Sequence, residues 1–380
     1  MSLGPSYTVV GLAPTERPLP ELQLAGVRPL MNGTPSVARA ALSFERPDLV
    51  ICSVPGAAGA AFLAEARVVI PSAIRVHVQP RDAGFDPVGA AAAHHVWTGP
   101  LSEPRLQAGV RRIRDRVGAC PLPDQLDTAA IPVLTDSARS LLHALDSEDI
   151  TFARAARLIE QDPGLTAAVL ALANSAFYGL PRRVDSVIDA ARFVGTGALR
   201  AAVLSCLLFP LHGPHKDRAL LLRSQGALRM QLVRRIVTHP AEDAAVAALL
   251  RDLGEYAMHV GMPGYTEAVA ELDPNADPLL WEAERYGTDR FLLGASLLNG
   301  WGLPHSVVAL VESGTHAWPH PSRGLDSESS LLVAGALTSE QTGANDEALD
   351  PNWVRAMRLE ERLPEWSAHA NELGVQWTAA

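Results

Sequence analysis

The chain has 380 residues, with 32 basic and 42 acidic side chains and a net charge of −10 at pH 7. At about 150 residues per domain this length predicts two domains, and the absence of any apolar run near 18 residues excludes a membrane-spanning protein and favours the cytoplasm. The negative charge argues against nucleic acid as a partner, because binding to phosphate backbones needs a basic surface.

The first 116 residues alternate short apolar runs with helix-like stretches. Strands are predicted at residues 7–12, 47–53, 74–78 and 95–97, and helices at residues 36–43, 57–66 and 103–116. Residues 49–52 are apolar throughout, as in a strand of a parallel sheet that is buried on both faces. This alternation predicts an α/β domain with a doubly wound parallel sheet.

The rest of the chain has a different character. Residues 117–131 contain two prolines and no hydrophobic period, so they are predicted to be a linker. Residues 132–340 form one segment of helical periodicity after another and predict an all-α domain. Residues 341–380 are polar, with one helix predicted over 351–363, and are expected to be an appendage.

Two rare residue types exclude further classes of chemistry. Lys216 is the single lysine, so no P-loop nucleotide-binding motif exists in this chain. Cys52, Cys120 and Cys206 are widely spaced and form no Cys-x-x-Cys pair. A disulfide scaffold and a thiolate zinc site are therefore excluded.

A long motif lies between residues 161 and 200. Its parts are Gln161-Asp162-Pro163-Gly164-Leu165-Thr166, then Leu172-Ala173-Asn174-Ser175-Ala176-Phe177-Tyr178-Gly179-Leu180-Pro181-Arg182-Arg183-Val184, and finally Gly195-Thr196-Gly197-Ala198-Leu199-Arg200. This combination closely resembles the HDOD domain, a helical regulatory relative of the HD phosphohydrolases. The resemblance covers about residues 128–340.

The motif also has a physical interpretation. Gly179, Leu180 and Pro181 form a helix end that cannot continue, and Asn174 and Ser175 can bond the carbonyls or amides freed there. We interpret the motif as a fixed helix–turn–helix packing element, with a partner-binding surface as the alternative.

The resemblance to HD enzymes implies a set of metal-ligand positions. Those enzymes hold divalent metals with histidines and aspartates and generate a metal-bound hydroxide. Here the paired His-Asp position reads Arg251-Asp252, and an arginine cannot ligate a cation. The other ligand positions read Arg223-Ser224, Arg290 and Gly335, with His316 near a later one. We therefore predict no metal and no cofactor.

The remaining candidate ligands have simpler interpretations. Asp252 is expected to cap a helix or pair with an arginine. His259 lies two helical turns after Asp252, and both His259 and His316 are expected to be core or surface residues. A catalytic role for the three remains an alternative.

The N-terminal domain resembles a response-regulator receiver. The resemblance rests on residues 46–56, 74–79 and 93–100. It implies a phosphorylatable aspartate after the third strand, an acidic pair after the first, a Ser/Thr after the fourth and a lysine after the fifth. Here these positions read Ser53, Gly11-Leu12, Gln79 and Gly99.

Each receiver position has therefore lost its chemistry. A serine cannot form an acyl phosphate, and without the acidic pair magnesium has no anionic ligands. We predict a pseudo-receiver that serves folding, homodimerisation or partner docking. The alternatives are a flavodoxin-like layer unrelated to receivers, or modification of Ser53 by another chemistry.

Together these features predict a bacterial-type signal-transduction protein that is not an enzyme and acts through contacts with an unidentified protein partner. Candidate contact patches are Arg182-Arg183, Arg234-Arg235 and the helix face with Arg111, Arg112, Arg114 and Arg116. One alternative is a residual phosphohydrolase, which requires Asp252, His259 and His316 within about 5 Å of one another around an open cavity. The other is a nucleotide sensor with Arg251 and Arg290 as phosphate clamps.

Overall fold

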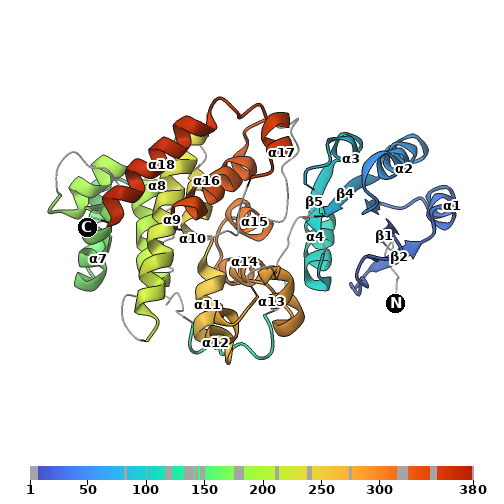
Figure 1. Cartoon of the computed structure of the whole chain (residues 1–380). Coiled ribbons are helices and arrows are strands. Elements are labelled where there is room, and N and C mark those ends of the chain that lie inside the picture. Colours follow the sequence, from blue (N-terminus) through green and yellow to red (C-terminus); the bar gives the residue numbers. More distant parts are fainter. Residues whose placement is uncertain are drawn as a thin grey trace.

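The computed structural model divides the protein into a parallel β-sheet with its helices and a larger helical part (Figure 1). The structure describes residues 7–80, 84–99, 101–115, 122–131, 141, 144–145, 150–174, 184–209, 214–237, 242–273, 276–314, 324–342 and 349–378.

The sheet has five strands in the order β2-β1-β3-β4-β5, and every neighbouring pair is parallel. The strands are β1 (Tyr7–Leu12), β2 (Val27–Gly33), β3 (Leu49–Cys52), β4 (Ile74–Pro80) and β5 (His95–Gly99). This order is that of flavodoxin-like and receiver sheets, so the predicted doubly wound fold is confirmed. The sequence analysis did not predict β2, which contains Pro29. Proline is confined to sheet edges because it donates no ladder hydrogen bond, and β2 lies at the edge.

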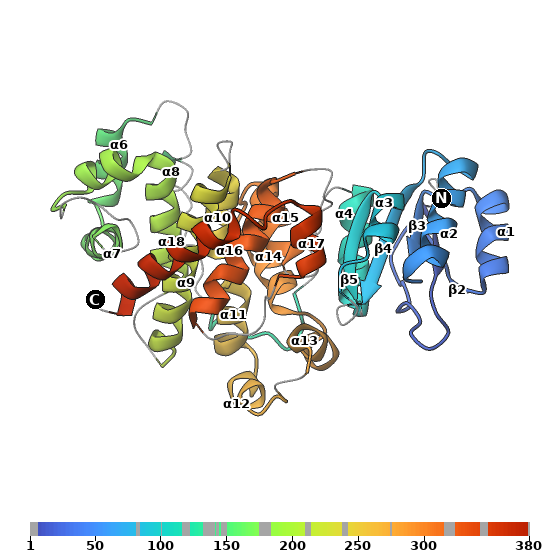
Figure 2. The same ribbon diagram turned by 45° about the horizontal axis from the view of Figure 1, so that its top comes forward.

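Four helices cover the two faces of the sheet. They are α1 (Pro35–Glu45), α2 (Gly56–Val69), α3 (Pro87–Ala92) and α4 (Glu103–Asp115). Leu42 of α1 and Phe62 of α2 pack with Val50 on one face. Leu106 and Val110 of α4 pack on the other face. In both views α4 and β5 lie on the side of the sheet that faces the helical domain (Figure 2).

The helical domain is built around α9. Its elements are α6 (Phe152–Ile159), α7 (Pro163–Ala173), α8 (Val187–Leu208), α9 (Lys216–Ile236), α10 (Glu242–Leu250), α11 (Leu253–Gly261), α12 (Tyr265–Ala270), α13 (Pro278–Tyr286), α14 (Arg290–Gly300), α15 (His305–Ser313) and α16 (Ser327–Thr342). Helix α9 packs against α10, α16 and a C-terminal helix. Helix α8 bends at Gly195, whose φ of 84° favours glycine. No helix within the described ranges is both long and apolar enough to cross a bilayer.

Two segments at the borders of this domain belong to its core. Leu126 and Ile131 are buried in the helical core, and the amide of Asp127 donates to the carbonyl of Gly261 at 2.8 Å. The described part of the segment expected to be a linker is thus packed on α11.

The C-terminal segment is not an appendage. It forms α17 (Pro351–Ala356) and α18 (Leu363–Thr378) rather than the single helix expected over 351–363. The side chains of Trp353 and Trp366 are buried in the helical core. The composition of this segment is polar, but it contains a few large apolar residues, each of which buries a large area.

Candidate functional site

Arg290, at one of the metal-ligand positions implied by the HD resemblance, binds two glutamates. It is the first residue of α14. Its Nη1 lies 2.9 Å from Oε2 of Glu255, and its Nε donates to Oε1 of Glu282 at 2.8 Å. Its backbone amide donates to the other carboxylate oxygen of Glu282 at 2.9 Å. The Arg290 guanidinium therefore occupies a place where a carboxylate pair would otherwise attract a cation.

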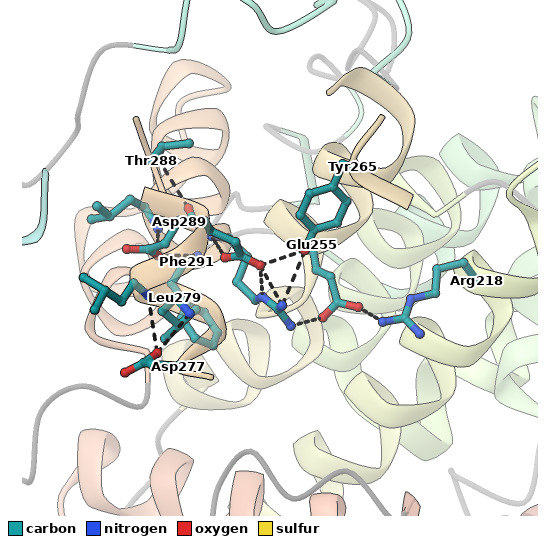
Figure 3. A network of polar contacts seen from close by, with 12 residues as sticks. Arg218, Glu255, Tyr265, Asp277, Leu279, Thr288, Asp289 and Phe291 are labelled. Carbon is teal, nitrogen blue, oxygen red and sulfur yellow. Dashed lines mark hydrogen bonds and ion pairs between the residues drawn. The ribbon is translucent and has the colours of Figure 1, made fainter. Parts of the chain in front are cut away.

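This network extends to two further side chains (Figure 3). Arg218 of α9 donates to the second oxygen of Glu255. The hydroxyl of Tyr265 donates to Oε1 of Glu282 at 2.7 Å, and burial raises the pKa of Tyr265 well above its usual value. Glu282 is fully buried. Both carboxylates are thus neutralised and hydrogen-bonded by the chain itself, as buried charges must be.

Arg251 and Asp252 also contact other side chains of the protein. Oδ2 of Asp252 accepts from Nη1 of Arg229 at 3.0 Å. Asp252 holds the position before α11, although its side chain makes no capping hydrogen bond. Arg251 is buried, with its guanidinium 5.0 Å from the ring centroid of Phe291. Asp252 is therefore paired with an arginine rather than placed toward open space.

His259 lies in a different environment from Asp252. Its Nδ1 is 2.9 Å from Oγ1 of Thr266, and its ring meets that of Tyr265 edge-on at 5.0 Å. Burial lowers the pKa of His259 to about 4, with further lowering from Arg218 and Arg290. Such a cationic setting opposes a metal ion as well as a proton. His316 lies outside the described residues.

The described residues do not fit a divalent metal. None of them form a group of three or more His, Cys, Asp or Glu side chains that could hold one. Arg223 donates to Sγ of Cys206 at 3.2 Å, and Ser224 donates to the carbonyl of Leu220 at 2.8 Å. Gly335 lies within α16 and offers no side chain. These positions do not suit a divalent metal, because they carry arginine side chains, a glycine, or polar groups that already make hydrogen bonds.

The motif residues that the structure describes tie helix ends together. Nδ2 of Asn174 donates to the carbonyls of Leu170 at 2.9 Å and Val184 at 2.7 Å, and Oδ1 accepts from the amide of Val184 at 2.7 Å. Oδ1 of Asp162 accepts from the amide of Leu165 at 3.0 Å, and Pro163 begins α7. Gln161 is exposed. Outside the described residues lie Ser175, Tyr178, Gly179, Pro181, Arg182, Arg183, Arg116 and Cys120.

The three receiver positions that end β3, β4 and β5 come together. Ser53, Gln79 and Gly99 line one cavity of about 210 Å³ at the carboxyl edge of the sheet. Ligands bind at this edge in open α/β sheets. Gln79 is buried, and its Oε1 accepts from the amide of Asp86 at 2.9 Å. Gly11-Leu12 is part of β1 and supplies no carboxylate.

Several arginines of the candidate contact patches that the structure describes make contacts within the chain. Arg234 pairs with Glu242 at 3.2 Å, and Arg235 pairs with Glu365 at 3.0 Å. Arg114 donates to the carbonyl of Ala25 at 2.7 Å. Arg234 and Arg235 nevertheless remain exposed on the surface of α9, so a role of these patches as contact surfaces stays a prediction.

One polar contact between the two domains was not predicted. Arg105 of α4 donates two hydrogen bonds to Asp289, from Nε to Oδ2 at 2.6 Å and from Nη2 to Oδ1 at 2.7 Å. Its Nη1 donates to the carbonyl of Glu312 at 2.7 Å. Asp289 immediately precedes Arg290, so the start of α14 contacts the α/β domain and the glutamate network together. Sequence spacing carries no signal for a pair this far apart in the chain.

Comparison with known proteins agrees with this architecture. Residues 131–317 match the HDOD domain family. A candidate phosphohydrolase of Shewanella amazonensis SB2B has a similar fold, with a TM-score of 0.50 and 21% identity over 73% of this chain and all of that one. A candidate signal transduction protein of Marinobacter aquaeolei VT8 has a TM-score of 0.53 and 20% identity over 83% of this chain and 71% of that one.

One curated relative, an uncharacterized protein of Treponema pallidum (strain Nichols), is 23% identical over 209 residues. The match takes in 53% of this chain and only 40% of that protein's length. Together, the motif, the helical fold and the family match show that residues 131–317 form an HDOD domain, which follows an α/β domain with receiver-like strand order.

Proposed function

We propose that this protein is a non-enzymatic regulator that transmits a signal through protein–protein contacts, with the α/β domain as input and the HDOD domain as output. The observation that carries the proposal is the ion pairing of Arg290 with Glu255 and Glu282 at a position where HD enzymes bind metal. A guanidinium stays charged at any physiological pH, so it repels a divalent cation permanently.

The α/β domain supports the same proposal. Its acceptor position is Ser53, so a phosphoryl-aspartate signal cannot form there. The domain is nevertheless joined to the HDOD domain by the buried pair of Arg105 and Asp289. A partner that binds the α/β domain can thereby act on α14, the helix that also carries Arg290.

The nucleotide-sensing alternative has less support. As a phosphate clamp, Arg290 would have to release carboxylates that already satisfy its donors. Arg251 is buried against Phe291 rather than directed to solvent. A phosphate would therefore have to displace contacts that the protein already makes.

The test of the proposal is an activity assay on the purified full chain. We expect no hydrolysis of bis-p-nitrophenyl phosphate or cyclic dinucleotides above the buffer rate, with Mn²⁺, Mg²⁺, Ni²⁺ or Fe²⁺ added. The same sample should show no thermal shift with mono- or dinucleotides.

Turnover that disappears in Asp252→Asn, while circular dichroism shows an intact fold, would overturn the proposal in favour of a residual phosphohydrolase. A matched control is Asp185→Asn, since Asp185 is an exposed aspartate of the same domain. Turnover that persists unchanged in both variants would point to a contaminating enzyme, and the proposal would stand.

A further inference from the structure

Two cavities of this protein adjoin and form one groove. The first is the cavity of about 210 Å³ at the carboxyl edge of the sheet. The second, of about 610 Å³, lies between the start of α4 and helix α13 of the HDOD domain. Pro20 and Leu101 line both cavities, so the two lie next to one another. We call this combined surface the edge groove.

The walls of the edge groove are largely apolar. They include Leu19, Val78 and Leu101 from the α/β domain and Leu280 and Ala283 from α13. Several prolines also line it, namely Pro14, Pro18, Pro20, Pro55 and Pro104. Proline has few accessible conformations, so such walls lose little entropy when a partner binds.

Two residues that line the sheet-edge part of the edge groove carry buried donors. Nε2 of Gln79 and Oγ of Ser53 are buried, and neither has a hydrogen-bond partner among the described residues. Gln79 is 1% exposed. Buried polar groups in proteins are normally satisfied, and each exception needs an explanation. A carbonyl oxygen of a bound main chain would accept from these donors.

The charge of the edge groove is negative. Glu16, Glu103 and Glu284 line it and are exposed, whereas Arg17 is the one basic residue among the described lining residues. The chain as a whole carries a net charge of −10. A segment with positive side chains is therefore attracted to this surface, and an acidic one is repelled.

We propose that the edge groove binds an extended segment of a partner protein in which apolar side chains alternate with arginine or lysine. The apolar side chains pack against the leucine and proline walls. The main-chain carbonyls accept from Gln79 and Ser53, and the basic side chains face the glutamates. This inference rests on the proposed regulatory function and names the surface and the partner chemistry that would serve it.

The test uses a fluorescein-labelled peptide of alternating leucine and arginine, titrated with the full chain and followed by fluorescence anisotropy. The comparison peptides replace every arginine with glutamate, or every leucine with serine. We expect the leucine–arginine peptide to bind more tightly than either comparison peptide by about tenfold or more, because both charge and apolar contact are required. Hydrogen–deuterium exchange of the complex should slow at residues 14–20 and 101–107.

Variants locate the binding on the protein. Glu103→Arg/Glu284→Arg should weaken the leucine–arginine peptide by about tenfold and strengthen the leucine–glutamate peptide. The matched control Glu160→Arg/Glu361→Arg makes the same charge change at exposed positions outside the groove lining and should bind as the wild type does. Ser53→Ala removes one buried donor and should weaken binding by about fivefold.

Equal binding of the basic and acidic peptides, equal effects of the two double variants, or no binding of any peptide would overturn the groove assignment. None of these outcomes touches the proposed function, which depends on the absence of hydrolysis. Hydrolytic turnover lost in Asp252→Asn would overturn the proposed function whatever the peptides do.

Discussion

The ion pair of Arg105 and Asp289 predicts a measurable link between the two domains. Arg105→Met keeps the length and apolar stem of the side chain but removes its charge and its hydrogen bonds. Asp289 is fully buried and loses two hydrogen bonds in this variant. It keeps two others, because its Oδ1 accepts from the amides of Phe291 and Leu292 at the start of α14.

These contacts set the expected magnitude. Removal of one partner of a buried ion pair costs about 3–5 kcal/mol of unfolding free energy. Because two amide hydrogen bonds to Asp289 remain, we expect Arg105→Met to cost about 3 kcal/mol. Asp289→Asn retains the capping interactions and should cost less, about 1–2 kcal/mol. The double variant should cost less than the sum of the two single ones, with a coupling of about 1–3 kcal/mol.

The assay is urea denaturation of the full chain, followed by circular dichroism at 222 nm and tryptophan fluorescence on the same samples. Coincident transitions would justify a single free energy of unfolding, whereas separate transitions would assign the loss to one domain. A loss below about 1 kcal/mol for Arg105→Met, or strict additivity in the double variant, would refute the reasoning that this pair holds the domains together.

Four other predictions concern the HDOD domain. Arg290→Met leaves two buried glutamates without their shared cation and should cost about 3–5 kcal/mol in urea denaturation; Arg290→Lys should restore little, because an ammonium cannot reproduce the forked contacts. The folded-state pKa of His259, about 4, lies below the unfolded value near 6.5. The contribution of neutral His259 to folding stability is therefore complete above about pH 6.5 and falls as the pH drops toward 4. His259→Phe should flatten this pH dependence of the melting temperature. Gly254→Ala would place a Cβ 1.7 Å from the carbonyl oxygen of Arg290 and should lower stability by about 3 kcal/mol or more, whereas Gly300→Ala has no neighbour within 4 Å and should change it by about 0.5 kcal/mol or less. Asn174→Ala removes three side-chain hydrogen bonds, two of which join the end of α7 to Val184 before α8, and should cost about 2–4 kcal/mol by thermal or urea unfolding. An unchanged stability would show that the motif asparagine has no structural role.

The secondary structure of the α/β domain was largely predictable, because burial leaves a period in the sequence. The apolar run of β3 and the helical spacing of Leu106 and Val110 in α4 both follow from which side faces the core. Strand β2 escaped prediction because it lies at the edge of the sheet, where burial does not impose a hydrophobic period on the sequence. Helix α18 and the burial of the C-terminal segment escaped prediction because its few apolar residues, Trp353 and Trp366 among them, lie within a polar segment.

The sequence by itself determined which chemical groups stand at the motif positions. By the resemblance to receivers, Ser53 and Gly99 stand at positions implied to hold aspartate and lysine, and by the resemblance to HD enzymes, Arg251 and Arg290 stand at positions implied to hold metal ligands. Only the tertiary structure decided what those groups contact. The partners of Arg290 come from α11 and α13, and Arg105 meets an aspartate 184 residues away in the chain. Such pairs depend on helix packing rather than on local periodicity, because a side chain reaches whatever the fold brings beside it.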